Sequence, residues 1–415
     1  MPSSYRTLKL GCYSINVTMS IVGNLPPILF LGFRSLYGLS FTQLGLLVTV
    51  NFLTQLAVDL IFSFFSHRFH IPRTLKFTPV LASAGLLIYL LSPLILPRAI
   101  FAGLLLGTVI FSAASGLGEV LISPVIAAIP AEDPEREMSK LHSVYAWGAV
   151  FIILVSTLFL LAFGAEAWPL LTALFTLIPL GGTVLLARAQ IPPMETPARV
   201  SGALRYLRLP SLWLCVIAIF LGGAAECTMA QWASGYLEGA LGIPKIWGDV
   251  FGVALFSVML GLGRTLYGKF GKNLGRILFL GGIGATACYL IAAISPDPVL
   301  GLLACAMTGF CASILWPGCL VVASERFPES GVFIYAMMAA GGDLGASLGP
   351  QLIGVVTDTA LTNPALLSLA SNLNLSPEAF GLKLGMLIGM LFPLCSIPVY
   401  FHIMKKREKQ RNIQI

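Results

Sequence analysis

Long apolar runs dominate this sequence and limit what it can fold into. Each run has about 20 residues or more, enough to cross roughly 30 Å of hydrocarbon as a helix. In lipid the backbone must satisfy its own hydrogen bonds, so such runs are expected to be helical. Only 10% of the residues are charged, against about 25% in soluble domains. We therefore expect an all-α polytopic membrane protein with twelve transmembrane helices, at approximately residues 8–33, 41–66, 75–97, 99–129, 140–163, 167–188, 210–237, 246–270, 277–295, 298–325, 331–358 and 380–404.

The distribution of basic residues predicts the orientation of these helices. One set of alternate loops holds only Arg34, Arg98, Lys245 and Lys383. The other set holds most of the basic residues, including the tail 405–407. Because positive charge is retained on the cytoplasmic side, we expect a multi-pass plasma-membrane or inner-membrane protein with both termini in the cytoplasm. The net charge of +7 follows from this topology and does not indicate nucleic acid as a partner.

A proline- and arginine-rich stretch between the sixth and seventh runs divides the chain. We expect an N-terminal six-helix bundle at 1–188, a cytoplasmic linker at 189–209, and a C-terminal six-helix bundle with a short basic tail at 210–415. The halves echo each other, because basic loops follow the second and eighth runs, and acidic loops follow the fourth and tenth. Matching loops in matching positions indicate a parallel repeat, as in two-lobed transporters.

The loop after the eighth run resembles the signature of the major facilitator superfamily. Within it, the chain most resembles the fucose permease-like group of sugar–proton symporters. The residues that carry this resemblance are Gly223–Glu226, Trp232, Tyr236-Leu237, Gly263-Arg264, Trp316-Pro317, the run from Gly341 to Asp358, and Glu119 five positions before Pro124. The position of the signature's aspartate is held by His67 and Gly268, and the group's first-helix acid has no counterpart at 23–27. The resemblance implies two pseudo-symmetric bundles, a central cavity and alternating access.

Three carboxyl groups in the interior of apolar runs are the expected proton-coupling residues. An ionised carboxylate there costs roughly 3 kcal/mol on insertion scales, so such groups commonly mark a proton or solute pathway. They are Glu119, Glu226 and Asp343. A structural hydrogen bond to a neighbouring helix is the alternative for each. We expect Arg264 to tie helix ends together at the cytoplasmic side, and Asp59 to bond helix ends.

Polar and aromatic residues at similar depth are the expected solute contacts. Asn24 precedes Pro26-Pro27, which we expect to bend or break the first helix. Trp232 lies about 240° around the helix from Glu226, so these two do not share one narrow face, whereas Gln231 is nearer in direction. Packing against lipid or other helices is the alternative for the aromatic residues. The set is Asn24, Gln55, Tyr145, Glu226, Gln231, Trp232 and Trp316.

The expected function is secondary active transport of a small polar solute, a sugar or related compound, by proton-coupled symport. A proton-driven exporter of amphipathic or cationic compounds is the alternative, and a non-transporting receptor is a third hypothesis. A sodium gradient could replace the proton gradient. No enzyme motif is present, and the eight cysteines lack metal-type spacing, so we expect no enzyme activity, cofactor, metal or disulfide. The expected partners are the solute and the lipid bilayer, with the chain acting as a monomer.

Overall fold

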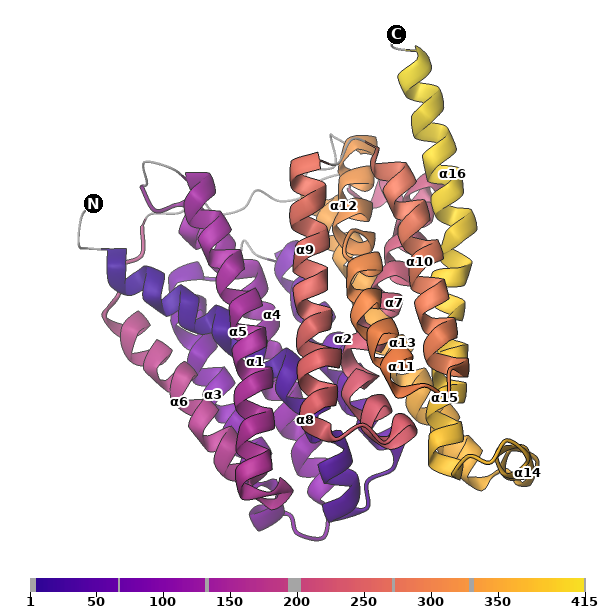
Figure 1. The fold of residues 1–415 in the computed structure, drawn as a ribbon. Coiled ribbons are helices and arrows are strands. Elements are labelled where there is room, and N and C mark those ends of the chain that lie inside the picture. Colours follow the sequence, from indigo (N-terminus) through magenta and orange to yellow (C-terminus); the bar gives the residue numbers. More distant parts are fainter. Residues whose placement is uncertain are drawn as a thin grey trace. The chain divides into compact units, whose positions relative to one another are not determined.

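A computed structural model describes residues 5–65, 68–130, 134–192, 203–270, 273–327 and 332–413. Over these ranges the chain is helical, with no strand (Figure 1). His67 and residues 193–202 of the expected linker lie outside the described residues. The helices of the first half are α1 (Arg6–Tyr37), α2 (Phe41–Phe65), α3 (Ile71–Ile95), α4 (Ile100–Ala127), α5 (Pro134–Phe163), the short η3 (Ala165–Ala167) and α6 (Trp168–Arg188).

Several of the second-half runs are built from more than one helix. The eighth run begins with α8 (Lys245–Trp247), continues as the π-helix η5 (Gly248–Ala254) and ends as α9 (Leu255–Phe270). The tenth run breaks between Ala312 and Leu315, and the twelfth breaks at Met390. The remaining elements are η4 (Ala203–Arg208), α7 (Pro210–Leu241), α10 (Leu274–Ile294), α11 (Pro298–Ala312), α12 (Leu315–Arg326), α13 (Val332–Thr362), α14 (Pro364–Asn372), α15 (Pro377–Gly389) and α16 (Leu391–Ile413).

The all-α membrane fold predicted from the sequence is confirmed. Within the described residues every expected apolar run is mainly helical, and ten helices there are long and apolar enough to cross a membrane. An eleventh candidate joins Met337–Thr362 to α14 across an 86° bend. In α5 the apolar helix Trp147–Phe163 is shorter than the others. The first helix was expected to bend or break at Pro26 and Pro27, and a break is wrong because α1 continues as one helix through both prolines.

The chain divides into two compact units. The first contains residues 1–39 and 50–201. In it α3 and α4 approach so closely that a Cβ at Gly85 would lie 2.4 Å from the backbone nitrogen of Phe111. The ring of Trp168, which begins α6, packs edge-on against Phe33 and Tyr89. Glycine-mediated contact and buried aromatic rings therefore hold this bundle together.

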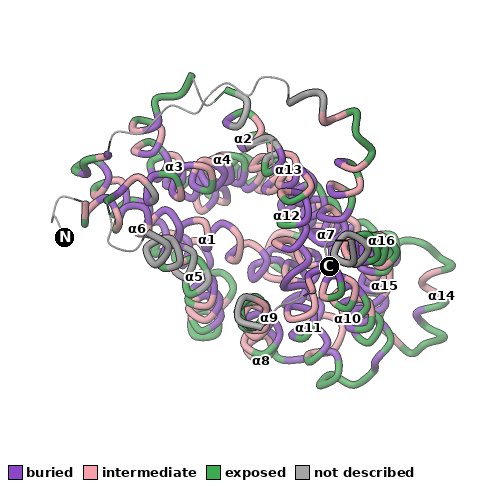
Figure 2. Tube along the Cα trace, turned by 90° about the horizontal axis from the view of Figure 1, so that it is seen from above, coloured by how far each residue is buried: buried purple, intermediate pink, exposed green. Residues whose placement is uncertain are grey.

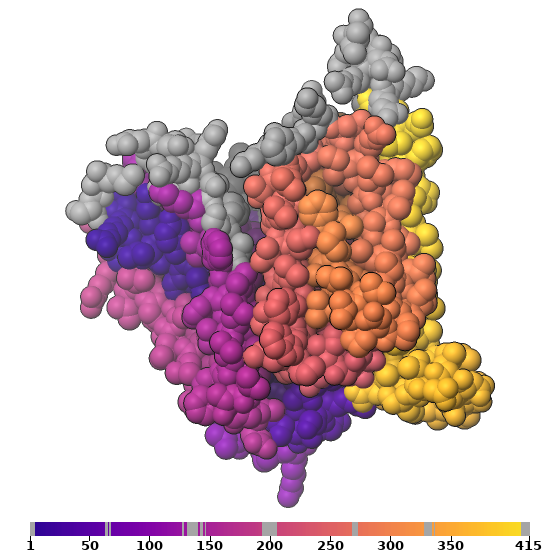
Figure 3. Space-filling model, in the orientation of Figure 1, coloured from indigo at the N-terminus to yellow at the C-terminus, as the bar shows by residue number. Residues whose placement is uncertain are grey.

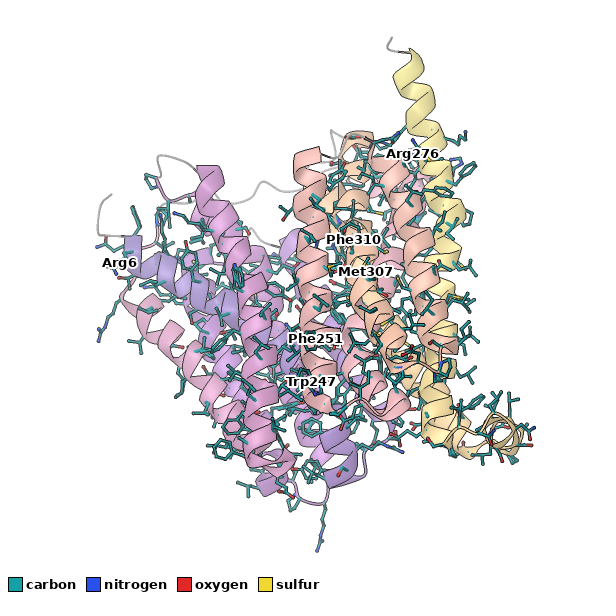
Figure 4. All side chains as sticks on the ribbon, in the orientation of Figure 1. Arg6, Trp247, Phe251, Arg276, Met307 and Phe310 are labelled. Carbon is teal, nitrogen blue, oxygen red and sulfur yellow. The ribbon has the colours of Figure 1, made fainter. Side chains whose placement is uncertain are left out.

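The second unit contains residues 40–49 and 202–415, and α7 is its central helix. Figure 2 shows α7 largely buried among α12, α13, α15 and α16, which all contact it. α14 stands out from the rest of this unit in Figure 3. Near one end, Trp247 and Phe251 stack at 5.6 Å on an exposed face, and Arg276 lies toward the other end (Figure 4). Exposed aromatic rings of this kind are common where membrane helices meet the headgroups.

The start of α2 belongs to the second unit because α13 holds it there. The Asp358 carboxylate accepts hydrogen bonds from the amides of Phe41 at 3.0 Å and Thr42 at 2.7 Å. These amides are among the first of α2, which have no partner inside the helix and carry the positive end of its dipole. A Cβ at Gly354, one turn before Asp358, would lie 2.3 Å from the Phe41 carbonyl oxygen, so glycine permits the approach.

Candidate functional site

The second unit contains an ion pair between two membrane helices. Arg264 Nη2 in α9 lies 3.1 Å from Glu226 Oε1 in α7 and donates a hydrogen bond to it. The Glu226 side chain is 13% exposed and that of Arg264 is 45% exposed. Arg264 was expected at a helix end as a structural tie, and Glu226 has no basic neighbour in sequence. The two side chains meet only through the fold, 38 residues apart.

A break in the tenth run helps to position Arg264. Proline has no N–H, so Pro317 cannot donate to the carbonyl of Ser313, four residues earlier. That carbonyl instead accepts a hydrogen bond of 3.1 Å from Arg264 Nε. The guanidinium therefore bridges the α11–α12 break and the Glu226 carboxylate. The other oxygen, Glu226 Oε2, is buried without a hydrogen-bond partner.

The indole of Trp316 lies in a notch made by two glycines, one of them a turn before Glu226. A Cβ at Gly342 of α13 would lie 2.5 Å from the ring, and one at Gly223 of α7 would lie 2.8 Å from it. Trp316 is partly buried, and Gly223 precedes Glu226 by one turn. Asp343 follows Gly342, is 8% exposed, and together with Glu226 acts electrostatically on Cys227. The structure thus brings Glu226, Trp316 and Asp343 together within one unit.

Two other predicted solute contacts of α7 lie inside the protein. Trp232 is fully buried, donates its indole N–H to the carbonyl of Pro350 at 2.8 Å, and packs against Phe41. Gln231 is 9% exposed. The ring of Trp232 is therefore closed off from a solute in this structure, and its hydrogen bond joins α7 to α13.

The first unit has its own polar cluster, along the contact of α2 with α4. Gln55 donates to Asn51 Oδ1 at 3.1 Å and accepts from Ser115 at 3.0 Å, and Ser112 also donates to Asn51 Oδ1. Glu119 follows Ser115 by one turn and is exposed. Among the described residues, no basic side chain forms an ion pair with it, in contrast to Glu226.

The remaining predicted contacts lie where α1 meets α5. Asn24 is partly exposed and donates its amide to the carbonyl of Ser20, while Ser20 Oγ donates to the carbonyl of Tyr145. The Tyr145 side chain is 40% exposed, and its hydroxyl lies 3.4 Å from where a Cβ at Gly23 would be. Both side chains are accessible from outside this bundle.

Comparison with known proteins decides the family. The family model of the Major Facilitator Superfamily matches residues 11–350, which is most of the chain. The chain belongs to the major facilitator superfamily. The superfamily predicted from its loops and glycine runs is thereby confirmed, and this facilitator is a multi-pass membrane transporter. Comparison with curated protein sequences found no match.

Solved structures of other facilitators share the fold at low sequence identity. A bacterial homologue of the human lysosomal transporter Spinster, inward-facing and occupied, is 16% identical with a TM-score of 0.72, covering 97% of each chain. The D-xylose–proton symporter is 16% identical with a TM-score of 0.67, covering 95% of this chain and 97% of the other. A variant of the Escherichia coli fucose–proton symporter is 15% identical with a TM-score of 0.55, covering 95% and 99%.

Proposed function

We propose that this facilitator is a proton-coupled symporter that moves a small polar solute, a sugar or related compound, by alternating access. The observation that carries the proposal is the difference between its two intramembrane glutamates. Glu226 is neutralised by Arg264, whereas Glu119 forms no ion pair with any described residue. One acid is thus built into a charge-balanced polar group, and the other can change its charge when it binds a proton.

Proton coupling fits Glu119 because no described basic residue balances its charge. An ionised carboxylate in a membrane helix needs water, while a protonated one tolerates apolar surroundings. Conformations that differ in the hydration of Glu119 therefore differ in proton affinity, and an inward proton gradient biases the cycle. Asp343 is a second proton-coupling candidate, because it is buried in α13 beside the glycine notch.

Solute recognition fits the group around Glu226. The Glu226–Arg264 pair supplies both acceptors and donors, which suits a hydroxyl-rich molecule. Trp316, which packs against Gly223 one turn before Glu226, supplies an aromatic ring on which we propose that a sugar ring stacks. The balanced charge favours a neutral solute over a cation. Sugar as the substrate class is supported by the fucose and xylose symporters among the similar structures. Asn24, Gln55 and Tyr145 are the solute contacts that we propose in the first unit.

We further propose a plasma-membrane or inner-membrane location with both termini in the cytoplasm. The basic residues of the chain support this orientation, since the tail 405–407 and the loops on the same side hold most of them.

Uptake into proteoliposomes tests the function. The purified chain is given radiolabelled sugars, one at a time, with an imposed inward proton gradient and, separately, an inward sodium gradient. We expect accumulation with the proton gradient only. Glu119→Gln should abolish accumulation and retain solute exchange, and Glu166→Gln, an exposed acid in η3, is the matched control. Sodium-driven accumulation, or solute efflux driven by proton entry, would refute proton symport.

A further inference from the structure

Six polar side chains form one continuous stripe where α2 crosses α4. On α2 they recur every four residues, and on α4 at spacings of three and four, so each set lies on one helix face. We call this stripe the α2–α4 seam; its members are Asn51, Gln55 and Asp59 on α2, and Ser112, Ser115 and Glu119 on α4. All six belong to the first unit.

Hydrogen bonds hold the first two levels of the seam in register. Ser112 donates to Asn51 Oδ1 at 2.6 Å, and Ser115 donates to Gln55 Oε1 at 3.0 Å. Gly116 lets the backbones approach, because a Cβ there would lie 3.1 Å from Val58 Cβ and 3.2 Å from Gln55 Cα. The crossing is therefore fixed immediately before its third level, where Asp59 and Glu119 occur.

The third level is a pair of carboxyl groups whose surroundings differ. Asp59 is 5% exposed, and its Oδ1 is buried without a hydrogen-bond partner. Glu119 is exposed, and it is the one charged group among the described residues that acts electrostatically on Asp59. Neither carboxyl forms an ion pair with a described basic residue. A buried, unpartnered carboxylate beside a second one is unfavourable unless something positive lies between them.

We propose that Asp59 and Glu119 together form a single-proton binding site, in which the two carboxyls share one proton and the exposed Glu119 exchanges it with water. A proton from hydronium forms one O–H bond on the pair and releases water, and the pair changes from two negative charges to one. The protonated carboxyl then donates a hydrogen bond to the other carboxylate, which gives Asp59 Oδ1 the partner it lacks. This inference deepens the proposed proton coupling and rests on it only for its role in transport.

Carbodiimide labelling of the full chain in lipid nanodiscs tests the site without measuring transport. The reagent dicyclohexylcarbodiimide modifies protonated carboxyls in apolar surroundings, and mass spectrometry of the adducts reports each residue across a pH series. We expect the labelling of Glu119 to fall as the pH rises and the pair loses its proton. In Asp59→Asn the neighbouring charge is gone, so half-maximal labelling of Glu119 should move to a pH lower by about one unit.

A matched variant keeps the result interpretable. Thr54→Ser is a conservative change on α2 outside the seam, and it should leave the labelling profile of Glu119 unchanged. An unchanged profile in Asp59→Asn would overturn the shared site. Protection of wild-type Glu119 by sodium at constant ionic strength would overturn it in favour of a metal cation. If the shift occurs but no solute accumulates with a proton gradient, the site stands and the proposed function fails.

Discussion

Arg264 donates a hydrogen bond of 3.1 Å to Glu226, and this contact joins α9 to α7 inside the second unit. Its partners differ in burial, with the carboxyl largely enclosed and the guanidinium about half exposed. Removing the arginine therefore leaves an enclosed charge without compensation, while removing both groups leaves none. This asymmetry makes the energetic role of the pair measurable.

We expect Arg264→Met to lower the stability of the protein more than the double variant Arg264→Met with Glu226→Gln. The loss in the single variant should be about 1–2 kcal/mol, less than the range for fully buried pairs because Arg264 is partly exposed. Thermal unfolding in detergent measures the difference. Equal losses in the single and double variants would show that the pair carries little energy in the folded state.

We expect Asp358→Ala to loosen the start of α2. The change removes two charge-assisted hydrogen bonds to the amides of Phe41 and Thr42, at a cost of about 1–3 kcal/mol. Hydrogen–deuterium exchange at these two amides should become faster, while the core of α3 keeps its protection. Asp358→Asn keeps an acceptor oxygen and should give an intermediate rate. Unchanged exchange in Asp358→Ala would contradict the capping role.

We expect Gly342→Ala to displace the indole of Trp316. The added methyl would lie 2.5 Å from the ring, so the ring or α13 must move. The melting temperature should fall and the solute KM should rise. Gly261→Ala is the matched control, because a Cβ there meets nothing within 4 Å. Alanine should favour that helix by up to about 1 kcal/mol. Equal melting temperatures and KM values in the two variants would show that Trp316 does not need the space at Gly342.

Two tryptophans should respond differently to replacement by phenylalanine. Trp232→Phe removes the hydrogen bond to the buried Pro350 carbonyl, so stability should fall by about 1–3 kcal/mol with the solute KM unchanged. Trp316→Phe keeps an aromatic ring in the glycine notch but shrinks its face, so KM should rise with little change in stability. Transport assays and thermal unfolding of both variants measure this. If KM rose in Trp232→Phe and not in Trp316→Phe, Trp232 and not Trp316 would be the solute contact.

The helices were predictable because lipid leaves a long apolar run few alternatives to a helix. A close packing contact near Gly342 was also predictable, because runs of small residues allow neighbouring helices to approach closely. The residue that packs there, Trp316, was not. The partner of Glu226 was not, because Arg264 is distant in sequence and near a helix end. Helix periodicity placed Trp232 and Glu226 on different faces of one helix, but it did not determine which face packs against the protein interior. Asp59 was expected only to bond helix ends, although its spacing from Asn51 and Gln55 already placed it on their face.

The position of the start of α2 matters for expressing the protein as two separate polypeptides. Residues 40–49 are encoded with the first half of the sequence, yet they belong to the second compact unit. If the gene were cut near residue 201 and the two pieces produced in separate cells, the C-terminal piece would lack the segment whose amides Asp358 binds. The two pieces could then restore the protein only if residues 40–49 of the first piece packed into the unit formed by the second piece.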